Sequence, residues 1–451
     1  MKTTFKISKG VICTNLPDEA IRKIEKDLSF PNPVYVNAMN QGRYISSDIP
    51  AELELFEIEK SKAWIPRGYI FYLIRWMKEH NHKYKVKDHT LLLKPLNLKF
   101  KGELRPYQMD AATDMLSYPI GVLDANTGSG KTVMLIYIIV QRQQPALIIV
   151  HSKELLYQWE DRILQFTGES CGLIGDGKFK IKPITVGIIN TIKNKISELQ
   201  DKFGMIIVDE VHKIAATSYM DTLQEFPAKY YQGATATSFR RDGLGHTIFA
   251  SIGPKKHTIS KQMLFDTKAV LIPEVFRIGT NFYYMFLNDY STMIKKLTED
   301  EKRNELICST IHSDFQLKGE STLIVSDRKN HLKTLQETLL NRYTDESLVL
   351  TGSTPKKERK EIVERIKTGE CKILFASLSL ISEGFDLPDL TVLFLTTPIK
   401  YKGKLIQCCG RILRPKKGKQ PRVYDFRDNM IDVLKYSGYS RDRVYKKEWD
   451  K

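Results

Sequence analysis

One glycine-rich segment constrains this chain more than any other feature. It follows a short apolar run, 119–124, and precedes the apolar stretch 133–141. Small residues let successive backbone N–H groups converge on an anion at the start of a helix, so a strand, a glycine-rich loop and a helix in this order predict a phosphate-binding P-loop. The loop consists of Ala125, Asn126, Thr127, Gly128, Ser129, Gly130, Lys131 and Thr132.

The last two residues of this loop carry its chemistry. Lys131 would reach the β- and γ-phosphates of a bound nucleotide, and Thr132 would hold Mg²⁺. The pattern GxxxxGK[ST] begins with Ala125 here, which is a mild departure from glycine. The alternative interpretation is a glycine-rich turn between a strand and a helix that binds no ligand.

A second site follows further along, where the apolar run 205–208 ends in two adjacent carboxylates. Carboxylates at a strand's end suit a metal site. Asp209 would therefore bind the Mg²⁺ that Thr132 holds, and Glu210 would orient and deprotonate the attacking water. The alternative is that both carboxylates only cap the next helix.

Length and composition predict a multidomain globular protein. At 451 residues and 52.1 kDa, the chain is too long for one ordinary core, so we expect two or three domains. No apolar run approaches the roughly 20 residues of a membrane span, and the first residues lack the apolar core of a signal peptide, so we expect a cytoplasmic protein with no membrane partner. The six cysteines have no metal-ligand spacing and are predicted to be reduced thiols.

The charge balance points to a polyanionic partner. The formal net charge is +17, from 70 Lys and Arg against 53 Asp and Glu. Phosphate contacts by such cations would give an affinity that falls steeply with salt. The alternative is a basic surface without a partner.

The pattern of apolar runs predicts an α/β fold with two similar domains. Continuous Val, Ile and Leu runs alternate with helical stretches in residues 96–262 and again in residues 263–451, which indicates parallel sheets covered on both faces. In the second of these domains we expect strands at 322–326 and 373–377 and a strongly charged helix at 356–367. Ligands then lie at the carboxyl ends of the strands. We interpret the Lys-, Phe- and Tyr-rich stretch 256–300 as the linker between the two domains plus the start of the second, with aromatic side chains at 280–286 used for packing.

Residues 1–95 predict a small α+β accessory domain. We expect a helix from Asn15, as its cap, to Leu28 with Pro17 in the first turn, the start of a strand at 32–37, and an aromatic-rich helix at 68–77. The second half is basic and aromatic, and could contact phosphates and unstacked bases. The interpretation we favour places Tyr72 and Trp76 in the core and leaves only the Lys and Arg heads to solvent.

Several segments resemble, in order and spacing, motifs of the superfamily 2 helicases. They are residues 105–108 (RPYQ), the P-loop, residues 150–159 (VHSKELLYQW), 209–212 (DEVH) and 233–237 (GATAT), which resemble a Q-like motif and motifs I, Ia, II and III. The resemblance implies that ATP is the nucleotide, that Gln108 contacts adenine and that the motif Ia region contacts the DNA backbone. It also implies that His212, Thr235 and Thr237 couple hydrolysis to strand movement. Residues 238–244 are similar to the XPB-like branch, which acts on DNA.

Two segments of the second domain extend the resemblance. Residues 383–388 (EGFDLP) resemble motif V, which places Asp386 at the nucleotide, and residues 407–414 (QCCGRILR) resemble motif VI, which gives Gln407 a coupling role. Arg411 and Arg414 stand three apart on an expected helix, so both guanidinium groups would face one way. If that face meets the P-loop, one of these arginines would act as an arginine finger. It would raise the rate of ATP hydrolysis by a factor of about 10³ to 10⁵. The alternative is that these arginines face solvent or the DNA backbone.

Taken together, the motifs are similar to those of the bacteriophage UvsW-type branch-migration helicases, with XPB-like proteins as cousins. This resemblance implies an ATP-dependent DNA helicase or translocase with two RecA-like domains behind the N-terminal accessory domain, acting on forks and four-way junctions in replication, recombination or repair. We expect its partners to be branched or forked duplex DNA and single-stranded DNA, and a monomer is compatible with the sequence. An RNA helicase is an alternative, although the chain has neither a DEAD sequence nor an RNA-binding module. A non-unwinding translocase or restriction-complex motor is another, although no PD-(D/E)xK-like nuclease constellation stands out.

Overall fold

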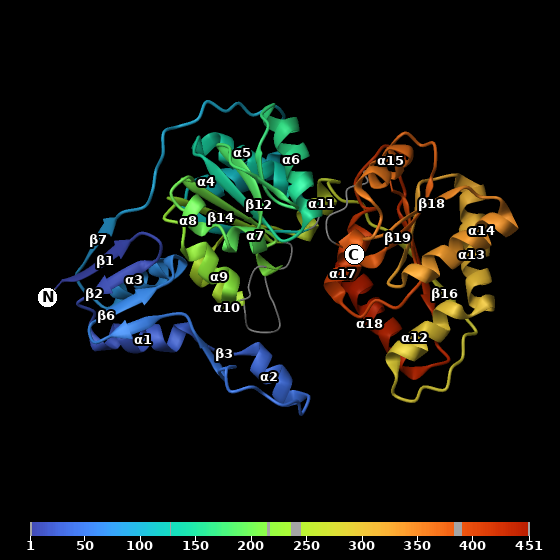
Figure 1. The fold of residues 1–451 in the computed structure, drawn as a ribbon, viewed down its shortest axis with the longest axis horizontal. Helices are drawn as coiled ribbons and strands as arrows, with labels where there is room; N and C mark the ends of the chain where they lie inside the picture. The colour runs from blue at the N-terminus through green and yellow to red at the C-terminus, as the bar shows by residue number, and fades with distance from the viewer. Residues whose placement is uncertain (1, 127, 214–216, 236–244, 383–389, 450–451) are drawn as a thin grey trace. The chain divides into compact units, whose positions relative to one another are not determined.

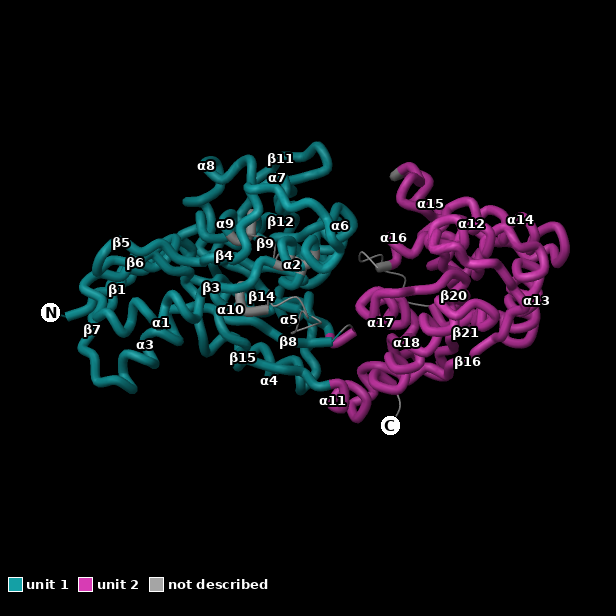
Figure 2. The backbone as a smooth tube through the Cα atoms, turned by 90° about the horizontal axis from the view of Figure 1, so that it is seen from below, with its two compact units in different colours: residues 1–126, 130–260 teal, residues 127–129, 261–451 magenta. Residues whose placement is uncertain are grey.

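A computed structural model describes residues 2–126, 128–213, 217–235, 245–382 and 390–449. The chain divides into two compact units, of which the first contains residues 1–126 and 130–260 and the second residues 127–129 and 261–451 (Figure 2). Among the described residues, no helix combines the length and the apolar character that crossing a membrane requires.

The first unit begins with a small sheet. Its described strands have the order β5-β6-β2-β1-β7, antiparallel except for the parallel pair β1 and β7. Helices α1 and α3 pack on this sheet (Figure 1) and build a core around Phe5, Ile24 and Leu73. The elements are β1 (Thr3–Ile7), β2 (Val11–Thr14), α1 (Asp18–Leu28), β3 (Ser29–Pro31), α2 (Pro33–Asn40), β4 (Glu52–Glu54), β5 (Glu57–Glu59), β6 (Lys62–Ile65), a 3-10 turn (Arg67–Tyr69), α3 (Ile70–Glu79) and β7 (Tyr84–Asp88).

Two local predictions for this region are wrong. Helix α1 begins at Asp18 and not after Asn15, because Asn15 has a left-handed φ of +54° and Pro17 is extended. Residues 33–40 form helix α2 where the sequence predicted a strand. The side-chain oxygen of Asn32 accepts a hydrogen bond from the backbone of Val34 at 3.0 Å, and a proline suits the first position of a helix, so Asn-Pro starts a helix here.

The aromatic residues of α3 also differ from expectation. Leu73 and Met77 occupy the core-facing side of this helix. Tyr72 is 44% exposed, so its predicted place in the core is wrong, and Trp76 is only partly buried against the cluster. The helix begins at Ile70, close to the predicted start at residue 68, after a 3-10 turn.

The rest of the first unit is a second sheet, which we call the motor sheet because it has the mostly parallel arrangement expected of a RecA-like domain. Its described strands have the order β11-β10-β12-β9-β13-β14-β8-β15, all parallel except for the hairpin β10-β11. Helices alternate with the strands, as the apolar runs predicted. The elements are α4 (Pro106–Leu116), β8 (Ile120–Ala125), α5 (Lys131–Arg142), β9 (Ala146–Val150), α6 (Lys153–Thr167), β10 (Gly172–Gly175), β11 (Lys178–Lys180), β12 (Ile184–Ile188), α7 (Ile189–Lys193), α8 (Ile196–Leu199), β13 (Met205–Asp209), a 3-10 turn (Val211–Lys213), α9 (Thr217–Gln224), β14 (Tyr230–Thr235), α10 (Gly245–Ile252) and β15 (Lys255–Ile259).

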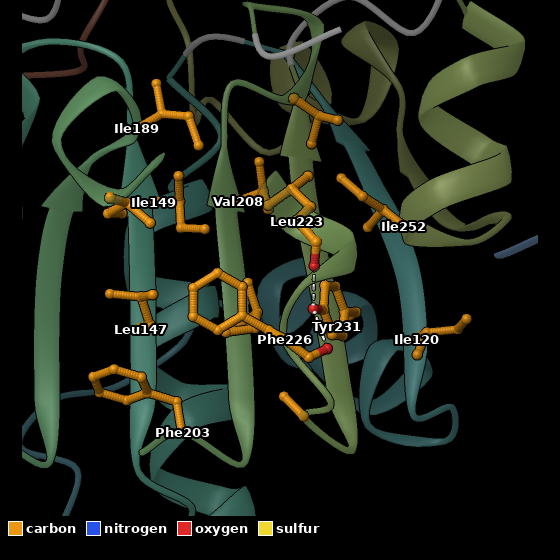
Figure 3. Close-up of a cluster of buried hydrophobic side chains, with 14 of the residues drawn as sticks. Ile120, Leu147, Ile149, Ile189, Phe203, Val208, Leu223, Phe226, Tyr231 and Ile252 are labelled. Atoms are coloured by element: carbon orange, nitrogen blue, oxygen red, sulfur yellow. Dashed lines mark hydrogen bonds between the residues drawn. The ribbon is translucent and has the colours of Figure 1, made fainter. Parts of the chain in front are cut away.

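One face of this sheet carries a large buried cluster, shown in Figure 3. Leu147, Ile149 and Val208 on the central strands pack with Phe226 and Tyr231. The Tyr231 hydroxyl donates to the carbonyls of Leu223 and Phe226 at 2.6 and 2.8 Å, so its polar atom is satisfied inside the core. The cluster fixes the strands whose carboxyl ends carry the candidate site.

The N-terminal sheet is joined to the motor sheet through a buried arginine. Arg67 is 6% exposed, and its guanidinium donates to the carbonyls of Ala228 at 2.5 Å and Lys229 at 3.4 Å. Its charge lies 4.8 Å from the centre of the Tyr231 ring. The next residue, Gly68, packs so closely on α10 that a Cβ would lie 2.2 Å from the carbonyl oxygen of Phe249. The 3-10 turn therefore contacts both β14 and α10.

The second unit has its own parallel sheet, with the strand order β16-β21-β20-β17-β19-β18 among the described residues. Strands β17 and β19 and helix α15 have the predicted bounds. The elements are α11 (Lys261–Asp266), β16 (Glu274–Gly279), α12 (Tyr290–Glu299), α13 (Glu301–Lys318), β17 (Thr322–Ser326), α14 (Lys329–Tyr343), β18 (Ser347–Leu350), α15 (Lys356–Lys367), β19 (Ile373–Ser377), α16 (Leu378–Ser382), β20 (Val392–Leu395), α17 (Lys402–Gly410), β21 (Arg422–Arg427) and α18 (Asp432–Trp449).

The stretch 256–300 is more regular than a linker. Most of β15 lies in it and forms an edge of the first motor sheet, while β16 forms an edge of the second. The aromatic segment that follows β16 packs as predicted through Phe282, Tyr284 and Phe286, which contact α12 and the start of α18. Tyr283 is an exception, because it is 66% exposed.

Candidate nucleotide site

Three neighbouring strands bring the predicted residues of the first unit to one edge of its sheet. Strand β14 lies between β13, which ends at Asp209, and β8, which ends at Ala125. In the register of the sheet, Asp209 is opposite Ala234, and Asp124 is opposite Thr235. The P-loop, the DEVH segment and the end of β14 therefore meet where parallel sheets bind their ligands.

The loop between β8 and α5 has the backbone that a phosphate cradle requires. Gly128 and Gly130 have left-handed φ values of +88° and +87°, and α5 begins directly at Lys131. A Cβ on Gly130 would lie 2.3 Å from the amide nitrogen of Gln108, so this position has neither the space nor the conformation for a side chain. Ser129 is buried, whereas Thr127 lies outside the described residues.

The ammonium group of Lys131 connects the two predicted halves of the site. Its Nζ donates to the carbonyl of Ala125 at 3.1 Å and lies 3.6 Å from the Oε1 of Glu210. The side chain is only 11% exposed. Lys131 is therefore held at the mouth of the loop, next to the carboxylate that we assign to the attacking water.

Asp209 is a buried carboxyl group at the base of the site. It is 5% exposed, and its two oxygens accept hydrogen bonds from Trp159 Nε1 at 2.9 Å and from the Glu210 backbone at 3.0 Å. Burial, and then the neighbouring charge of Glu210, raise the pKa of Asp209 to about 6, although Trp159 and Lys131 act in the opposite direction. Sequence reasoning missed Trp159, whose only signal is its position on the apolar side of α6.

A chain of polar contacts leads from Glu210 to the end of β14. Glu210 has a left-handed φ of +49°, and its Oε2 lies 3.3 Å from the Nδ1 of His212. The same nitrogen lies 3.0 Å from the hydroxyl oxygen of Thr235. The strained backbone at Glu210 thus accompanies a contact path between the two predicted coupling residues. Thr237 and the segment 238–244 lie outside the described residues.

Gln108 has a structural task as well as its predicted one. Its side-chain oxygen accepts a hydrogen bond from the Arg105 backbone at 3.0 Å, which caps the start of α4. Its amide nitrogen lies against Gly130, because a Cβ on that glycine would be only 2.3 Å away from it. The residue is 6% exposed and is placed beside the loop, while its contact with adenine stays a prediction.

The residues of this site fit Mg²⁺ and a nucleoside triphosphate. A divalent cation would relieve the like-charge repulsion between Asp209 and Glu210 that raises the pKa of Asp209. Thr132, in the first turn of α5, and Asp209 would hold the ion, and residues 126–132 would hold the phosphates. When bound, Mg²⁺ would neutralise charge on the transferring phosphoryl group.

The predicted helical arrangement of the two motif VI arginines is wrong. Helix α17 ends at Gly410, and Arg411 is its C-terminal cap. Pro415 disfavours the α conformation of Arg414, so the helix cannot continue through this pair. The Nε of Arg411 instead donates to the carbonyl of Ile381 at 3.2 Å, on α16. Gln407 lies on α17 and is partly buried, whereas Asp386 lies outside the described residues.

The cysteines behave as expected for reduced thiols. All six are buried and unpaired by disulfides. Burial raises the pKa of Cys13, Cys171, Cys308 and Cys408 to about 12, which keeps these thiols protonated.

Comparisons with known proteins agree with this geometry. The family described as "Type III restriction enzyme, res subunit" matches residues 101–240, and the family described as "Helicase conserved C-terminal domain" matches residues 301–416. The DNA 3'-5' translocase XPB2 of Sulfurisphaera tokodaii is 27% identical over 71% of this chain and 80% of its own. A protein of Acanthamoeba polyphaga mimivirus, named as an ATP-dependent RNA helicase, is 28% identical over 96% of this chain and 83% of its own.

A solved structure shows the same fold. It is a fragment described as a subunit of a type I restriction enzyme from Vibrio vulnificus, and it is 18% identical, covers 78% of this chain and 67% of that chain, and has a TM-score of 0.60. The two family matches cover the P-loop, the DEVH segment and motif VI in the predicted order. The chain therefore belongs to the superfamily 2 helicases, in their XPB-like branch.

Proposed function

We propose that this chain is an ATP-dependent DNA helicase or translocase that acts on branched DNA, such as forks and four-way junctions, in replication, recombination or repair. One observation carries the proposal. The contacts from Lys131 through Glu210 and His212 to Thr235 connect the phosphate loop with the end of β14. Such a path lets the state of the nucleotide act on a segment outside the nucleotide site.

Each residue has a defined task in this proposal. Lys131 and residues 126–130 bind the phosphates, Thr132 and Asp209 bind Mg²⁺, and Glu210 orients the attacking water and takes its proton. His212 and Thr235 respond to that change through their shared contact at 3.0 Å. Arg411 and Arg414 of the second unit stabilise the charge of the transferring phosphoryl group.

DNA is the favoured nucleic acid. The net charge of +17 favours a polyanion, and a similar archaeal protein is named as a DNA translocase. The similar mimivirus protein is named as an RNA helicase, so an RNA helicase is the second candidate. A double-strand translocase that does not separate strands, such as a restriction-complex motor, is the third.

We further propose that residues 1–95 are an accessory domain that grips DNA, ahead of motor domains at residues 96–262 and 263–451. The support is charge on an exposed edge. Lys85 and Lys87 are exposed on β7, an edge strand of the N-terminal sheet, and Lys83 is exposed directly before it. Phosphate contacts position a protein on DNA without reading its sequence. The alternative use of these lysines is to protect a sheet edge from aggregation.

The decisive experiment measures ATP turnover and strand separation on matched substrates. Single-stranded DNA, linear duplex, a fork, a four-way junction and RNA of equal length should be compared side by side. We expect the fork and the junction to stimulate turnover most and to be unwound. Stronger stimulation by RNA than by every DNA would contradict the proposal, and turnover on duplex without strand separation would favour the translocase.

The accessory domain has a separate test. A chain without residues 1–95 should keep basal turnover if the motor sheets fold. Its binding to branched DNA should weaken and become less sensitive to salt, because fewer counterions are released. An unchanged salt dependence in a folded truncated chain would show that the domain is not a DNA grip.

A further inference from the structure

The last helix of the second unit, α18 (labelled in Figure 1), carries two exposed tyrosines and three exposed cations on one side. Tyr436 is 64% exposed and Tyr439 is 49% exposed. Positions 436, 439, 443 and 447 recur at helical spacing, so their side chains share one face. We call this face the tyrosine-cation stripe, and it comprises Tyr436, Tyr439, Arg443, Lys446 and Lys447.

The opposite face of α18 is firmly attached to the sheet, so the exposure of the stripe is not a fraying end. Arg441 is buried and pairs with Asp425 on β21, and the Tyr445 hydroxyl donates to the same carboxylate at 2.8 Å. Leu434 packs in the cluster with Phe282. The helix therefore presents the stripe in one fixed orientation, and the core does not require these residues.

The three cations of the stripe form no ion pair with the described residues of the chain. The acids of α18 beyond its first turn have partners elsewhere, because Asp442 pairs with Arg277 and Arg427, and Glu448 pairs with Lys261 and Lys402. Within the described part of the chain, no carboxylate lies within 4.0 Å of the cationic groups of the stripe. The guanidinium of Arg443 donates a hydrogen bond to the Ser440 hydroxyl at 3.3 Å. Only Asp432, at the start of α18, adds an acidic side chain to this face.

The aromatic end of the stripe lies near the functional edge of the second sheet. Helix α18 follows β21, so it starts where the parallel strands end. Ligands of such sheets bind at this edge. The tyrosine rings form an edge-on pair with centres 6.2 Å apart, and they come first along the helix, before the cations. A linear ligand leaving the edge along α18 would therefore meet the rings before the positive charges.

We propose that the tyrosine-cation stripe is a contact surface for single-stranded nucleic acid. The rings of Tyr436 and Tyr439 stack with unpaired bases, and the three cations contact the phosphates that follow. This role rests on the proposed nucleic-acid-dependent function and adds a contact outside the helicase motifs. An acidic protein segment could satisfy the cations, but it would leave two adjacent exposed aromatic rings without a matching partner.

The test separates stacking from charge. Tyr436→Ala with Tyr439→Ala should weaken binding of an oligo-dT strand by at least about fivefold, which is the lower limit for losing one base–aromatic stack, with little change in salt dependence. Arg443→Ala with Lys447→Ala should reduce the salt slope of log K by about 1.4, because each single-strand phosphate contact contributes about 0.7. Fluorescence anisotropy without nucleotide measures both quantities.

Matched controls make the result specific. Tyr283→Ala removes an exposed tyrosine of the same unit, and Lys333→Ala removes an exposed cation of α14, so both should bind like wild type. Tyr436→Phe with Tyr439→Phe should also bind like wild type, because the rings remain. Thermal unfolding and basal ATP turnover show that each variant is folded.

Each outcome has one meaning. A wild-type chain that binds neither oligo-dT nor any other nucleic acid overturns both the proposed function and this role. Wild-type binding of oligo-dT that the stripe variants share in full overturns only the stripe. If the stripe variants lose binding of poly-glutamate but retain binding of oligo-dT, the surface serves an acidic protein and the proposal is wrong.

Discussion

Replacing Asp209 by asparagine should stabilise the first unit while removing its activity. The carboxyl group is buried beside Glu210, and its pKa is raised from 3.8 to about 6. The folded chain therefore binds this proton more tightly than the unfolded chain, so ionisation lowers the free energy of unfolding as pH rises from 3.8 to 6, and the loss is constant above pH 6. A shift of about two pKa units corresponds to about 3 kcal/mol.

Asp209→Asn removes the charge and keeps an oxygen for the Trp159 N–H, but its NH2 group cannot accept the hydrogen bond that Asp209 receives from the Glu210 backbone, so the full electrostatic gain is an upper limit. We expect the free energy of unfolding to rise by as much as about 3 kcal/mol at pH 8, and by about half as much at pH 5. For a unit of this size, the rise at pH 8 corresponds to an increase in Tm of roughly 6–12 °C. Scanning calorimetry without nucleotide measures this difference at both pH values. Mg²⁺-dependent ATP turnover should be lost.

A second buried aspartate provides the control. Asp314 accepts two hydrogen bonds from the Arg422 guanidinium at 2.9 and 3.0 Å, so its charge is compensated. Asp314→Asn should therefore lower stability at pH 8, because it weakens a buried ion pair. The reasoning about Asp209 would be refuted if Asp209→Asn were no more stable than wild type at pH 8, or if its advantage did not shrink at pH 5.

Three further outcomes test the site. Glu210→Gln should keep nucleotide affinity and abolish steady-state turnover, whereas Lys131→Ala should weaken both, and near wild-type turnover of the glutamine variant would remove Glu210 from its role. Arg411→Ala and Arg414→Ala should leave nucleotide affinity largely intact and lower turnover more than about a hundredfold in at least one of them, so full activity in both would exclude the arginine finger. Gly130→Ala should weaken nucleotide affinity in equilibrium binding, because the new Cβ would lie 2.3 Å from the Gln108 amide and because Gly130 has a φ of +87°. Normal affinity would mean that the loop can rearrange.

The motor sheets could be predicted because their signals are local. Continuous apolar runs such as 322–326 and 373–377 form buried parallel strands at the predicted positions, and the glycine pattern gives the loop between β8 and α5. Once Asp209 is placed at a strand's end, the common direction of parallel strands brings it to the edge that carries the P-loop. That part of the site follows from topology and needs no knowledge of side-chain contacts.

The remaining features depend on contacts between distant residues. Trp159 and Asp209 are 50 positions apart, and nothing in either local sequence indicates their hydrogen bond. The failed helix through Arg414 had a local signal, Pro415, but the motif pattern outweighed it. The aromatic residues of 68–77 predict a buried Tyr72, whereas Leu73 and Met77 already fill the core-facing side of α3.

The attachment of the N-terminal sheet shows how such a contact changes an experiment. Arg67 reaches carbonyls more than 160 positions away, and Gly68 touches α10, whose Ala250 belongs to the N-terminal core cluster. Removing residues 1–95 would therefore uncover apolar surface on α10 and withdraw a guanidinium from two carbonyls, so a truncated chain loses motor stability together with any DNA grip.

Charge reversal at Lys85 and Lys87 separates these effects. Both residues lie on the exposed strand β7, and neither takes part in the hydrogen bonds from Arg67 to the carbonyls of Ala228 and Lys229. Lys85→Glu with Lys87→Glu should therefore leave Tm and basal ATP turnover near wild type while weakening binding to branched DNA, and the salt slope should fall by about 1.8 if both residues contact phosphates of duplex DNA. Arg67→Met should produce the opposite pattern, with a lower Tm and an unchanged salt slope in the protein that remains folded, because it removes a buried charge and its hydrogen bonds without altering the exposed edge. If both variants lowered Tm and left the salt slope unchanged, the N-terminal sheet would be a structural support for the motor and not a surface for DNA.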